Sequence, residues 1–120
     1  MPIYAFICRD GGDKTQLRRD LLLDHLRYID TVLDHVVVAG PCPPVQAGDG
    51  RQFEGSIMMY RAETAAAARS LFENDPYFKA KVWDSCEMMV FSPVAGDYIG
   101  GRTWQIVDGK VTRTEPRRNP

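Results

Sequence analysis

Hydrophobic positions recur along this chain in two periods, and the period of each segment predicts whether it forms a strand or a helix. Segments in which both alternating sets of residues are apolar are typical of strands covered on both faces. Segments with apolar residues three and four positions apart are typical of amphipathic helices. The pattern predicts strands at residues 2–8, 35–40, 56–61 and 85–91, and helices at residues 14–33 and 65–73.

The first predicted helix carries a histidine within its hydrophobic face. At about 100° per residue, His25 falls inside a stripe formed by Leu22, Leu26, Ile29 and Leu33 and widened by Leu21 and Val32. An imidazole that points toward a core needs a polar partner or a function. One interpretation is a general acid or base that lines a cleft, and the other is a structural histidine bonded to a backbone carbonyl.

Polar residues mark the places where the helices begin. Asp13 is a good N-cap for the first helix, with Gln16 placed to complete a capping box. Thr64 caps the second helix, whose inward face is expected to consist of Ala65, Ala68, Leu71 and Phe72. Asp75 is kept out of the helical region because Pro76 follows it, so it is expected to cap a short helix that starts at the proline.

The resulting β-α-β-β-α-β order predicts an α+β fold of the ferredoxin-like type, with a four-stranded antiparallel sheet and two helices on one of its faces. The other face would carry tyrosine, phenylalanine and methionine side chains in water. Burying each such side chain contributes about 1.5–3 kcal/mol, and a second copy related by two-fold symmetry is the simplest cover. We therefore expect a homodimer that packs through its sheet faces.

Residues 94–120 extend beyond this domain, which is placed at residues 1–93. Asp108-Gly109 is typical of a type I′ turn and predicts a hairpin over residues 103–114. One face of this hairpin needs a docking site on the same chain or on the partner, because it carries Trp104, Ile106 and Val111. Residues 115–120 are expected to form a solvated tail.

Composition and charge are those of a globular domain, and they limit the classes of partner that the protein is expected to bind. The 120 residues suit one domain, with 44% hydrophobic and 26% charged side chains. A net charge of −1 argues against a nucleic-acid or membrane partner held by bulk electrostatics. No signal-peptide pattern is present, and three cysteines without a Cys-x-x-Cys spacing indicate free thiols, so we expect a cytoplasmic protein.

No spacing in the chain indicates a metal or a cofactor, and we expect neither. His25 and His35 are too far apart to form a local ligand pair. No Gly-x-Ser-x-Gly segment supports a Ser-His-Asp triad. The loop at residues 41–55 is rich in proline and glycine and is long enough for a lid over a site, with a plain surface loop as the alternative.

Four short motifs follow one another in a characteristic order. They are His25-Leu26, Ala39-Gly40-Pro41, Gly55-Ser56 and Asn74-Asp75-Pro76-Tyr77. In this order and spacing they resemble the YCII-related (YciI-like) family of the dimeric α+β barrel superfamily, over about residues 3–93. The resemblance implies a ferredoxin-like protomer, a dimer through the sheet faces, and a cleft that holds a paired histidine and aspartate.

Carried onto this chain residue by residue, the resemblance assigns the pair to His25 and Asp75 and places Ser56 at the family's strand serine. We expect these three residues to be catalytic. The residues expected to bind substrate are Tyr77, Arg18, Gly40 and Pro41. Three of these residues also have a structural interpretation. Asp75 would be a helix cap only, Ser56 a small residue at a strand start, and Tyr77 a core aromatic.

Two positions depart from the family pattern. Members often carry an arginine three residues before the histidine, where this chain has Leu22, although Arg18 lies one turn further back near the same face. After the Asp-Pro-Tyr motif the family usually shows Ala-Gly, where this chain has Ala80-Lys81. The first change removes a charge that would anchor an anionic substrate, and the second replaces the free backbone of glycine with a charged residue.

One studied activity of the family is dehydrochlorination of a chlorinated hydroxyhydroquinone. The resemblance therefore favours a cofactor-independent enzyme that moves a proton on an aromatic or enol-type metabolite, by elimination, dehydrochlorination or isomerisation. His25 would transfer the proton, Asp75 would orient the imidazole, and Ser56 or backbone amides would polarise a substrate oxygen. The alternative is a non-catalytic module that binds or senses a small ligand in the same cleft. A haem-handling protein or cofactorless oxygenase is a third reading that rests on fold analogy alone.

Overall fold

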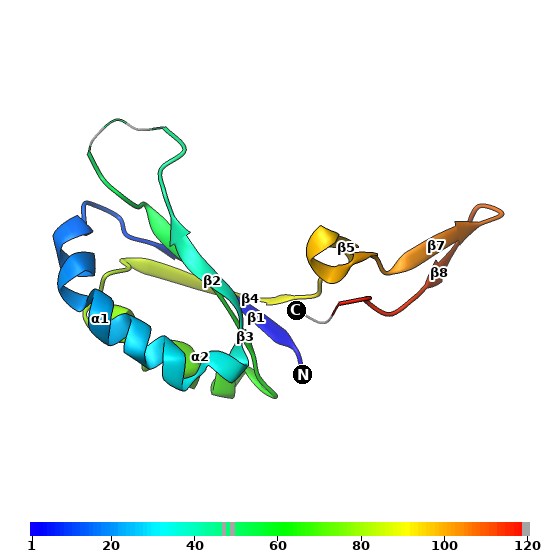
Figure 1. The fold of residues 1–120 in the computed structure, drawn as a ribbon, viewed down its shortest axis with the longest axis horizontal. Helices are drawn as coiled ribbons and strands as arrows, with labels where there is room; N and C mark the ends of the chain where they lie inside the picture. The colour runs from blue at the N-terminus through cyan, green and yellow to red at the C-terminus, as the bar shows by residue number, and fades with distance from the viewer. Residues whose placement is uncertain (47, 49, 119–120) are drawn as a thin grey trace.

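The computed structural model describes residues 1–46, 48 and 50–118, and it shows one antiparallel sheet with helices on a single face (Figure 1). The strands lie in the order β2-β3-β1-β4. They are β1 (Ile3–Arg9), β2 (Val36–Cys42), β3 (Gly55–Arg61) and β4 (Ser85–Phe91). This strand order, with a helix after β1 and another after β3, confirms the predicted ferredoxin-like α+β fold.

The helical segments that accompany this sheet are α1 (Thr15–Thr31), the 3-10 helix η1 (Leu33–His35), α2 (Ala65–Glu73) and α3 (Pro76–Lys79). The caps predicted for α2 and α3 are confirmed. Thr64 Oγ1 accepts a hydrogen bond from the Ala67 N–H at 3.1 Å. Asp75 Oδ1 accepts one from the Tyr77 N–H at 2.9 Å. Each cap satisfies a backbone donor that has no partner inside its helix.

The capping box predicted at the start of α1 is wrong. Asp13 Oδ1 does accept a hydrogen bond from the Thr15 N–H, but Lys14 occupies the N-cap position and Gln16 donates to Asp20 instead of returning to the cap. Lys14 is held elsewhere, because its Nζ lies 2.8 Å from Asp84 Oδ1 just before β4. The first turn of α1 is therefore set by a tertiary ion pair and not by a local capping motif.

Aromatic side chains form the core between the sheet and the helices. The Phe6 ring of β1 stacks on Phe72 of α2 with centroids 4.2 Å apart, and Phe72 stacks on Trp83 at 5.3 Å. On α2 the predicted inward face is largely confirmed, except that Ala65 is exposed. The buried core consists of Tyr4, Phe6, Cys8, Met58, Tyr60, Ala62, Ala68, Phe72, Tyr77, Val82 and Trp83.

The hydrophobic stripe predicted on α1 is only partly buried. Leu21, Ile29 and Val32 pack partly against the core, whereas Leu22, Leu26 and Leu33 are 47%, 51% and 56% exposed. The fully buried side chain of α1 is Arg18. The helix is thus rotated so that a charged residue and its neighbours face the sheet, while much of the leucine stripe lies outside the core.

The second face of the sheet has no helix against it in Figure 1. The strand register places on this face Ile7, Val38, Ile57, Met59, Met89 and Phe91. Met89 is 49% and Phe91 is 43% exposed. The methionines and the phenylalanine expected here are present, whereas Tyr4 and Tyr60 lie in the core on the helix side. The chain therefore leaves a partly exposed apolar sheet face.

The residues after β4 form an arm that projects away from the sheet (Figure 1). Its elements are β5 (Ala95–Gly96), the 3-10 helix η2 (Asp97–Ile99), β6 (Gly101–Arg102), β7 (Trp104–Val107) and β8 (Lys110–Arg113). Asp108 and Gly109 have φ values of 51° and 74°, as a type I′ turn requires, so the predicted hairpin is confirmed. The strand pair β5–β6 was not predicted.

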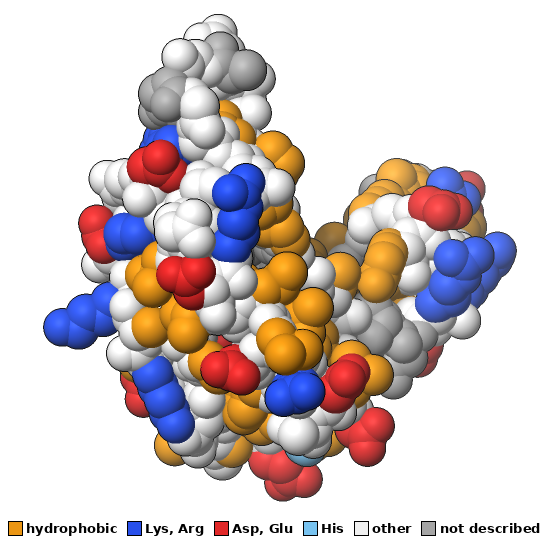
Figure 2. All heavy atoms as spheres, turned by 60° about the vertical axis from the view of Figure 1, so that its left-hand side comes forward, with side chains coloured by type: hydrophobic (Ala, Val, Ile, Leu, Met, Phe, Trp, Pro, Cys, Tyr) orange, Lys and Arg blue, Asp and Glu red, His pale blue; other side chains and the backbone are white. Residues whose placement is uncertain are grey.

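Within the described part of the chain, the apolar face of the hairpin is covered only near Trp104, which is half-buried. Ile106 and Val111 lie opposite each other and are 67% and 58% exposed. Figure 2 shows the arm separated from the body by an open groove. Arg118 donates from its backbone N–H to the Ile99 carbonyl at 2.9 Å, so the expected solvated tail is bound to the arm up to this residue. Residues 119–120 lie outside the described residues.

Lys81 ends α3 in a conformation that suits glycine. Its φ is 60°, in the left-handed region. The Val82 N–H donates to the Tyr77 carbonyl and the Lys81 N–H to the Phe78 carbonyl, the two bonds of a Schellman motif with Lys81 at its left-handed position. The backbone thus keeps a geometry suited to glycine at the position where the family resemblance places one.

We predict that Lys81→Gly raises the free energy of unfolding by up to about 1 kcal/mol, because glycine has no Cβ to oppose a positive φ. Lys79→Gly, inside α3, is the matched control and should lower it by about 0.5–1 kcal/mol. Urea unfolding followed by circular dichroism measures both. A loss of stability in Lys81→Gly equal to that in Lys79→Gly would contradict the strain argument.

Candidate functional site

A cavity of about 490 Å³ lies between α1 and the β2–β3 side of the sheet. Side chains reach it from α1, β2, β3, the loop before β3 and the start of α3. Six of the seven predicted site residues line it, namely His25, Ser56, Tyr77, Arg18, Gly40 and Pro41. The seventh, Asp75, is fully buried behind the wall and contacts His25. The structure therefore brings all the predicted site residues to one place.

His25 and Asp75 form the central contact of the site. His25 Nδ1 lies 2.7 Å from Asp75 Oδ1, and the imidazole stacks on the Tyr77 ring at 3.9 Å with an interplanar angle of 4°. A carboxylate can only accept a hydrogen bond, so it fixes the proton of a neutral imidazole on Nδ1. Nε2 then carries the free electron pair and makes no hydrogen bond to any of the described residues. This atom is free to accept a proton from a ligand in the cavity.

Asp75 caps a helix and orients the imidazole at the same time. Its Oδ1 accepts both the His25 Nδ1–H and the Tyr77 N–H. The two interpretations offered by the sequence are thus compatible in one carboxylate. Asp75 Oδ2 is buried without a hydrogen-bond partner among the described residues. The local reason for this placement is Pro76, which ends the preceding helix and holds Asp75 at the N-cap of α3.

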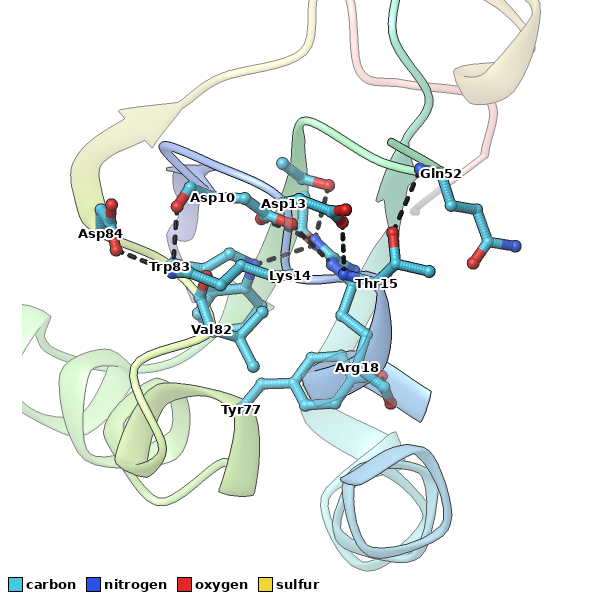
Figure 3. Close-up of polar contacts among 12 residues, drawn as sticks. Asp10, Asp13, Lys14, Thr15, Arg18, Gln52, Tyr77, Val82, Trp83 and Asp84 are labelled. Atoms are coloured by element: carbon cyan, nitrogen blue, oxygen red, sulfur yellow. Dashed lines mark hydrogen bonds and ion pairs between the residues drawn. The ribbon is translucent and has the colours of Figure 1, made fainter. Parts of the chain in front are cut away.

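Arg18 lies under the cavity in a buried ion pair that the sequence analysis missed. Its Nε and one terminal nitrogen each lie 2.8 Å from an oxygen of Asp10, and both side chains are almost fully buried (Figure 3). The same terminal nitrogen donates to the Gly55 carbonyl and to Ser56 Oγ. A signal for this pair was present in the chain, since Asp10 directly follows a buried strand and Arg18 follows one turn into the next helix.

Ser56 accepts hydrogen bonds from two residues below the cavity. Its Oγ receives one from Arg18 at 3.1 Å and one from Trp83 Nε1 at 3.2 Å. Both acceptor positions of the hydroxyl are then occupied, which leaves its proton to be donated. Ser56 makes no hydrogen bond to His25 among the described contacts, in agreement with the absence of a Ser-His-Asp triad motif. The hydroxyl is placed as a donor toward a ligand oxygen.

The loop before β3 and the exposed leucines of α1 complete the cavity. Phe53 and Gln52 of the loop line it, and Phe53 lies 5.0 Å from the Arg18 guanidinium carbon. Leu22 and Leu26, which are outside the core, line the opposite side. The loop thus forms part of the site, as its functional interpretation requires. Residues 47 and 49 of this loop lie outside the described residues.

Tyr77 connects the two polar pairs of the site. Its hydroxyl donates to the Arg18 carbonyl at 3.0 Å, and its ring lies 5.6 Å from the Arg18 guanidinium carbon. Burial raises the pKa of the Tyr77 phenol, with the charge of Arg18 acting in the opposite direction. The phenol therefore keeps its proton near neutral pH and holds the ring under His25. Tyr60, by contrast, is fully buried in the core.

Neither a metal-binding cluster nor a membrane-spanning helix occurs in the described ranges. No group of three or more histidine, cysteine, aspartate or glutamate side chains there is arranged to hold a metal ion. Among the same residues, no helix combines the length and apolar character needed to cross a bilayer.

Known proteins resemble this chain over the sheet and its helices. Protein YciI of Escherichia coli O6:H1 and that of Shigella flexneri are each 27% identical over 96 residues, which cover 77% of this chain and 98% of the relative. A solved structure, the 5-chloro-2-hydroxyhydroquinone dehydrochlorinase TftG from Burkholderia phenoliruptrix in complex with 2,5-dihydroxybenzoquinone, is 25% identical with a TM-score of 0.67. That match covers 80% of this chain and 97% of TftG.

The sequence model of the YCII-related domain matches residues 3–92. The match begins with β1 and ends after β4, so it contains every residue of the cavity wall and leaves out the C-terminal arm. Because it spans most of the chain, the protein belongs to the YCII-related domain family.

Proposed function

We propose that this protein is an enzyme that catalyses a proton-transfer reaction, an elimination or isomerisation, on a small hydroxylated aromatic or enol-type compound. The observation that carries the proposal is the 2.7 Å contact between His25 Nδ1 and Asp75 Oδ1 at the wall of a cavity. A histidine held in one tautomer by a buried carboxylate is a recurrent arrangement for general acid–base catalysis.

His25 acts as the base in this reaction. Its Nε2 takes a proton from the bound compound, and the imidazolium that forms is stabilised by the negative charge of Asp75. Because Asp75 is fully buried, little solvent weakens this attraction. In an elimination, the electron pair left by the proton displaces a leaving group from the neighbouring part of the compound. In an isomerisation, His25 returns the proton to another atom.

Ser56 and Arg18 act on an oxygen of the same compound. The Ser56 hydroxyl donates its proton toward the oxygen on which negative charge develops, and its two donors, Arg18 and Trp83, strengthen that hydrogen bond. Fixed donors aimed at a developing oxyanion lower the barrier because they need no rearrangement during the reaction. The charge of Arg18 is shared with Asp10, which favours a phenol or enol over a compound with a full carboxylate.

The size and lining of the cavity suit a single small ring. About 490 Å³ lies at the lower end of the range for small-molecule sites, and much of the wall is leucine, phenylalanine and tyrosine. TftG supports the same class of compound, since it is a dehydrochlorinase described with a quinone bound. Leu22, where family members often have arginine, makes this wall more apolar and favours an uncharged ring.

We also propose that the protein is a homodimer that packs through the open face of its sheet. This face carries partly exposed methionine and phenylalanine side chains. A stable interface of standard size buries about 1,200–2,000 Å², and the open face spans all four strands of the sheet. The cavity beside His25 lies on the helix side, so this packing leaves it open.

We predict that His25→Ala lowers turnover by about 10²–10⁴-fold, because it removes the base. The probe reaction is dechlorination of 5-chloro-2-hydroxyhydroquinone or turnover of related hydroxylated rings, followed by ultraviolet absorbance and chloride release. His35→Ala is the matched control, since His35 is exposed outside the cavity and its Nδ1 lies 3.1 Å from the Arg61 carbonyl oxygen. Stabilisation of the wild-type protein by these compounds in thermal-shift assays, without any product, would show a binding module instead of an enzyme.

We predict that Asp75→Asn separates the two roles of this carboxylate. Asparagine is as good an N-cap as aspartate, so α3 and the midpoint of thermal unfolding should change little. The amide carries no charge to stabilise the imidazolium, so turnover should fall by about 10²–10⁴-fold. Asp75→Ala should lower both turnover and stability. Full turnover in Asp75→Asn would reduce Asp75 to a helix cap.

We predict that Met89→Glu converts the dimer to a monomer, because it places a charge among the apolar side chains of the sheet face. Leu23→Glu is the control: Leu23 is 59% exposed on α1, outside the cavity and the sheet. Size-exclusion chromatography with light scattering gives the mass of each. A monomeric wild-type protein, or a dimer that survives Met89→Glu, would rule out this interface.

A further inference from the structure

A second cavity, of about 740 Å³, lies on the other side of the core beside the edge strand β4. Its floor is formed by the core aromatics Phe6, Phe72 and Trp83. Cys86 opens into it from β4. Three cations, Arg69, Lys79 and Lys81, and two carboxylates, Glu73 and Asp84, also line it. The proposed acid–base chemistry does not use this cavity.

Cys86 lies directly opposite Cys8 across β1 and β4. Even-numbered residues along β1 form their backbone hydrogen bonds toward β3. At the two ends of this pairing, the Asp10 N–H donates to the Glu54 carbonyl and the Ala62 N–H donates to the Pro2 carbonyl. Successive residues of a strand point their backbone groups to opposite sides, so Cys8 and Cys86 are a non-hydrogen-bonded pair. The Cα atoms of such pairs are about 4.5 Å apart, within the span of a disulfide.

The two thiols of this pair differ in access and in acidity. Cys86 is exposed, whereas Cys8 is buried beneath the sheet edge. The hydrogen bond between the two thiols, together with burial, raises the pKa of Cys8, and the same hydrogen bond lowers the pKa of Cys86. The accessible thiol is therefore the one that more readily becomes the nucleophilic thiolate, and the buried thiol is placed beside it.

We propose that Cys8 and Cys86 form a reversible cross-strand disulfide, with Cys86 as the attacking thiol and Cys8 as the resolving thiol. The oxidant is a small anionic disulfide of the glutathione type, whose carboxylates suit the three cations of the cavity. The Cys86 thiolate attacks one sulfur of the oxidant and expels a thiolate, leaving a mixed disulfide. Cys8 then attacks Cys86 Sγ and expels the second thiolate, which takes up the proton that Cys8 gives up. Two protein thiols are oxidised and one disulfide is reduced to two thiols.

This site adjoins the first cavity through β1. Cys8 lies opposite Cys86 on one side and opposite Ser56 on the other. Trp83 lines the second cavity and donates to Ser56, which lines the first. Oxidation of the pair thus takes place one strand away from a residue of the proposed active site. The disulfide itself does not depend on the proposed reaction.

The test is equilibration of the reduced full-length protein in glutathione buffers with a rising oxidised fraction, followed by alkylation of free thiols, intact mass measurement and peptide mapping. The mass of the wild-type protein is expected to fall by that of two hydrogen atoms, and peptide mapping is expected to give two peptides joined by a Cys8–Cys86 disulfide. A reductant should reverse both changes. Cys42→Ser is the matched control, because Cys42 lies on β2 opposite Gly55, and it should behave like the wild type.

The single variants assign the two roles. Cys8→Ser is expected to stop at one glutathione attached to Cys86, and Cys86→Ser is expected to lose the intramolecular disulfide completely. Circular dichroism checks that each variant is folded, and Cys86→Ser, at an exposed position, keeps the test decisive if Cys8→Ser does not fold. Three results would overturn the proposal: oxidation confined to Cys42, disulfides only between two chains, or Cys8 and Cys86 still alkylated separately at the most oxidising ratio.

Discussion

The buried ion pair between Arg18 and Asp10 fixes how α1 lies on the sheet. Asp10 follows β1, and Arg18 reaches from α1 to it and to the start of β3 through Gly55 and Ser56. Breaking such a pair by removing one partner typically costs about 3–5 kcal/mol, because it leaves a charge buried without compensation. Rotation of α1 about its axis would separate Arg18 from Asp10. The helix therefore has one orientation in which both charged side chains keep their hydrogen bonds.

That orientation produces the site. With Arg18 turned toward the sheet, His25 lies two turns along on the same side of α1 and reaches Asp75. The leucines expected in the core, Leu22 and Leu26, are left at the rim, where they line the cavity. A polar contact between β1 and α1 therefore decides both the position of the imidazole and the apolar character of the wall beside it. The position of Asp75 is set locally, because Pro76 directly after it holds it at the N-cap of α3.

Three surfaces of the chain still have exposed apolar or reactive groups: the open sheet face, the C-terminal arm and the cavity beside β4. They involve different residues of the chain. The arm lies outside the part of the chain matched by the family, and it is bound to itself through Thr103, Thr114 and Arg118. The arm thus extends the chain beyond the part that the family model covers.

The sequence by itself determined the strand order, both helices, the caps at Thr64 and Asp75, and the hairpin at Asp108-Gly109. These features depend on periodicity and on turn and capping chemistry, which act between residues close in the chain. The family resemblance carried by the motifs also assigned His25, Asp75 and Ser56 to one site. Only the tertiary structure decided which face of α1 is buried, because both a leucine stripe and an Arg18 face were available and the choice depended on Asp10. The acceptor role of Ser56 toward Arg18 and Trp83, and the opposition of Cys8 and Cys86, were likewise decided by strand register, since they join residues far apart in the chain that local pattern does not connect.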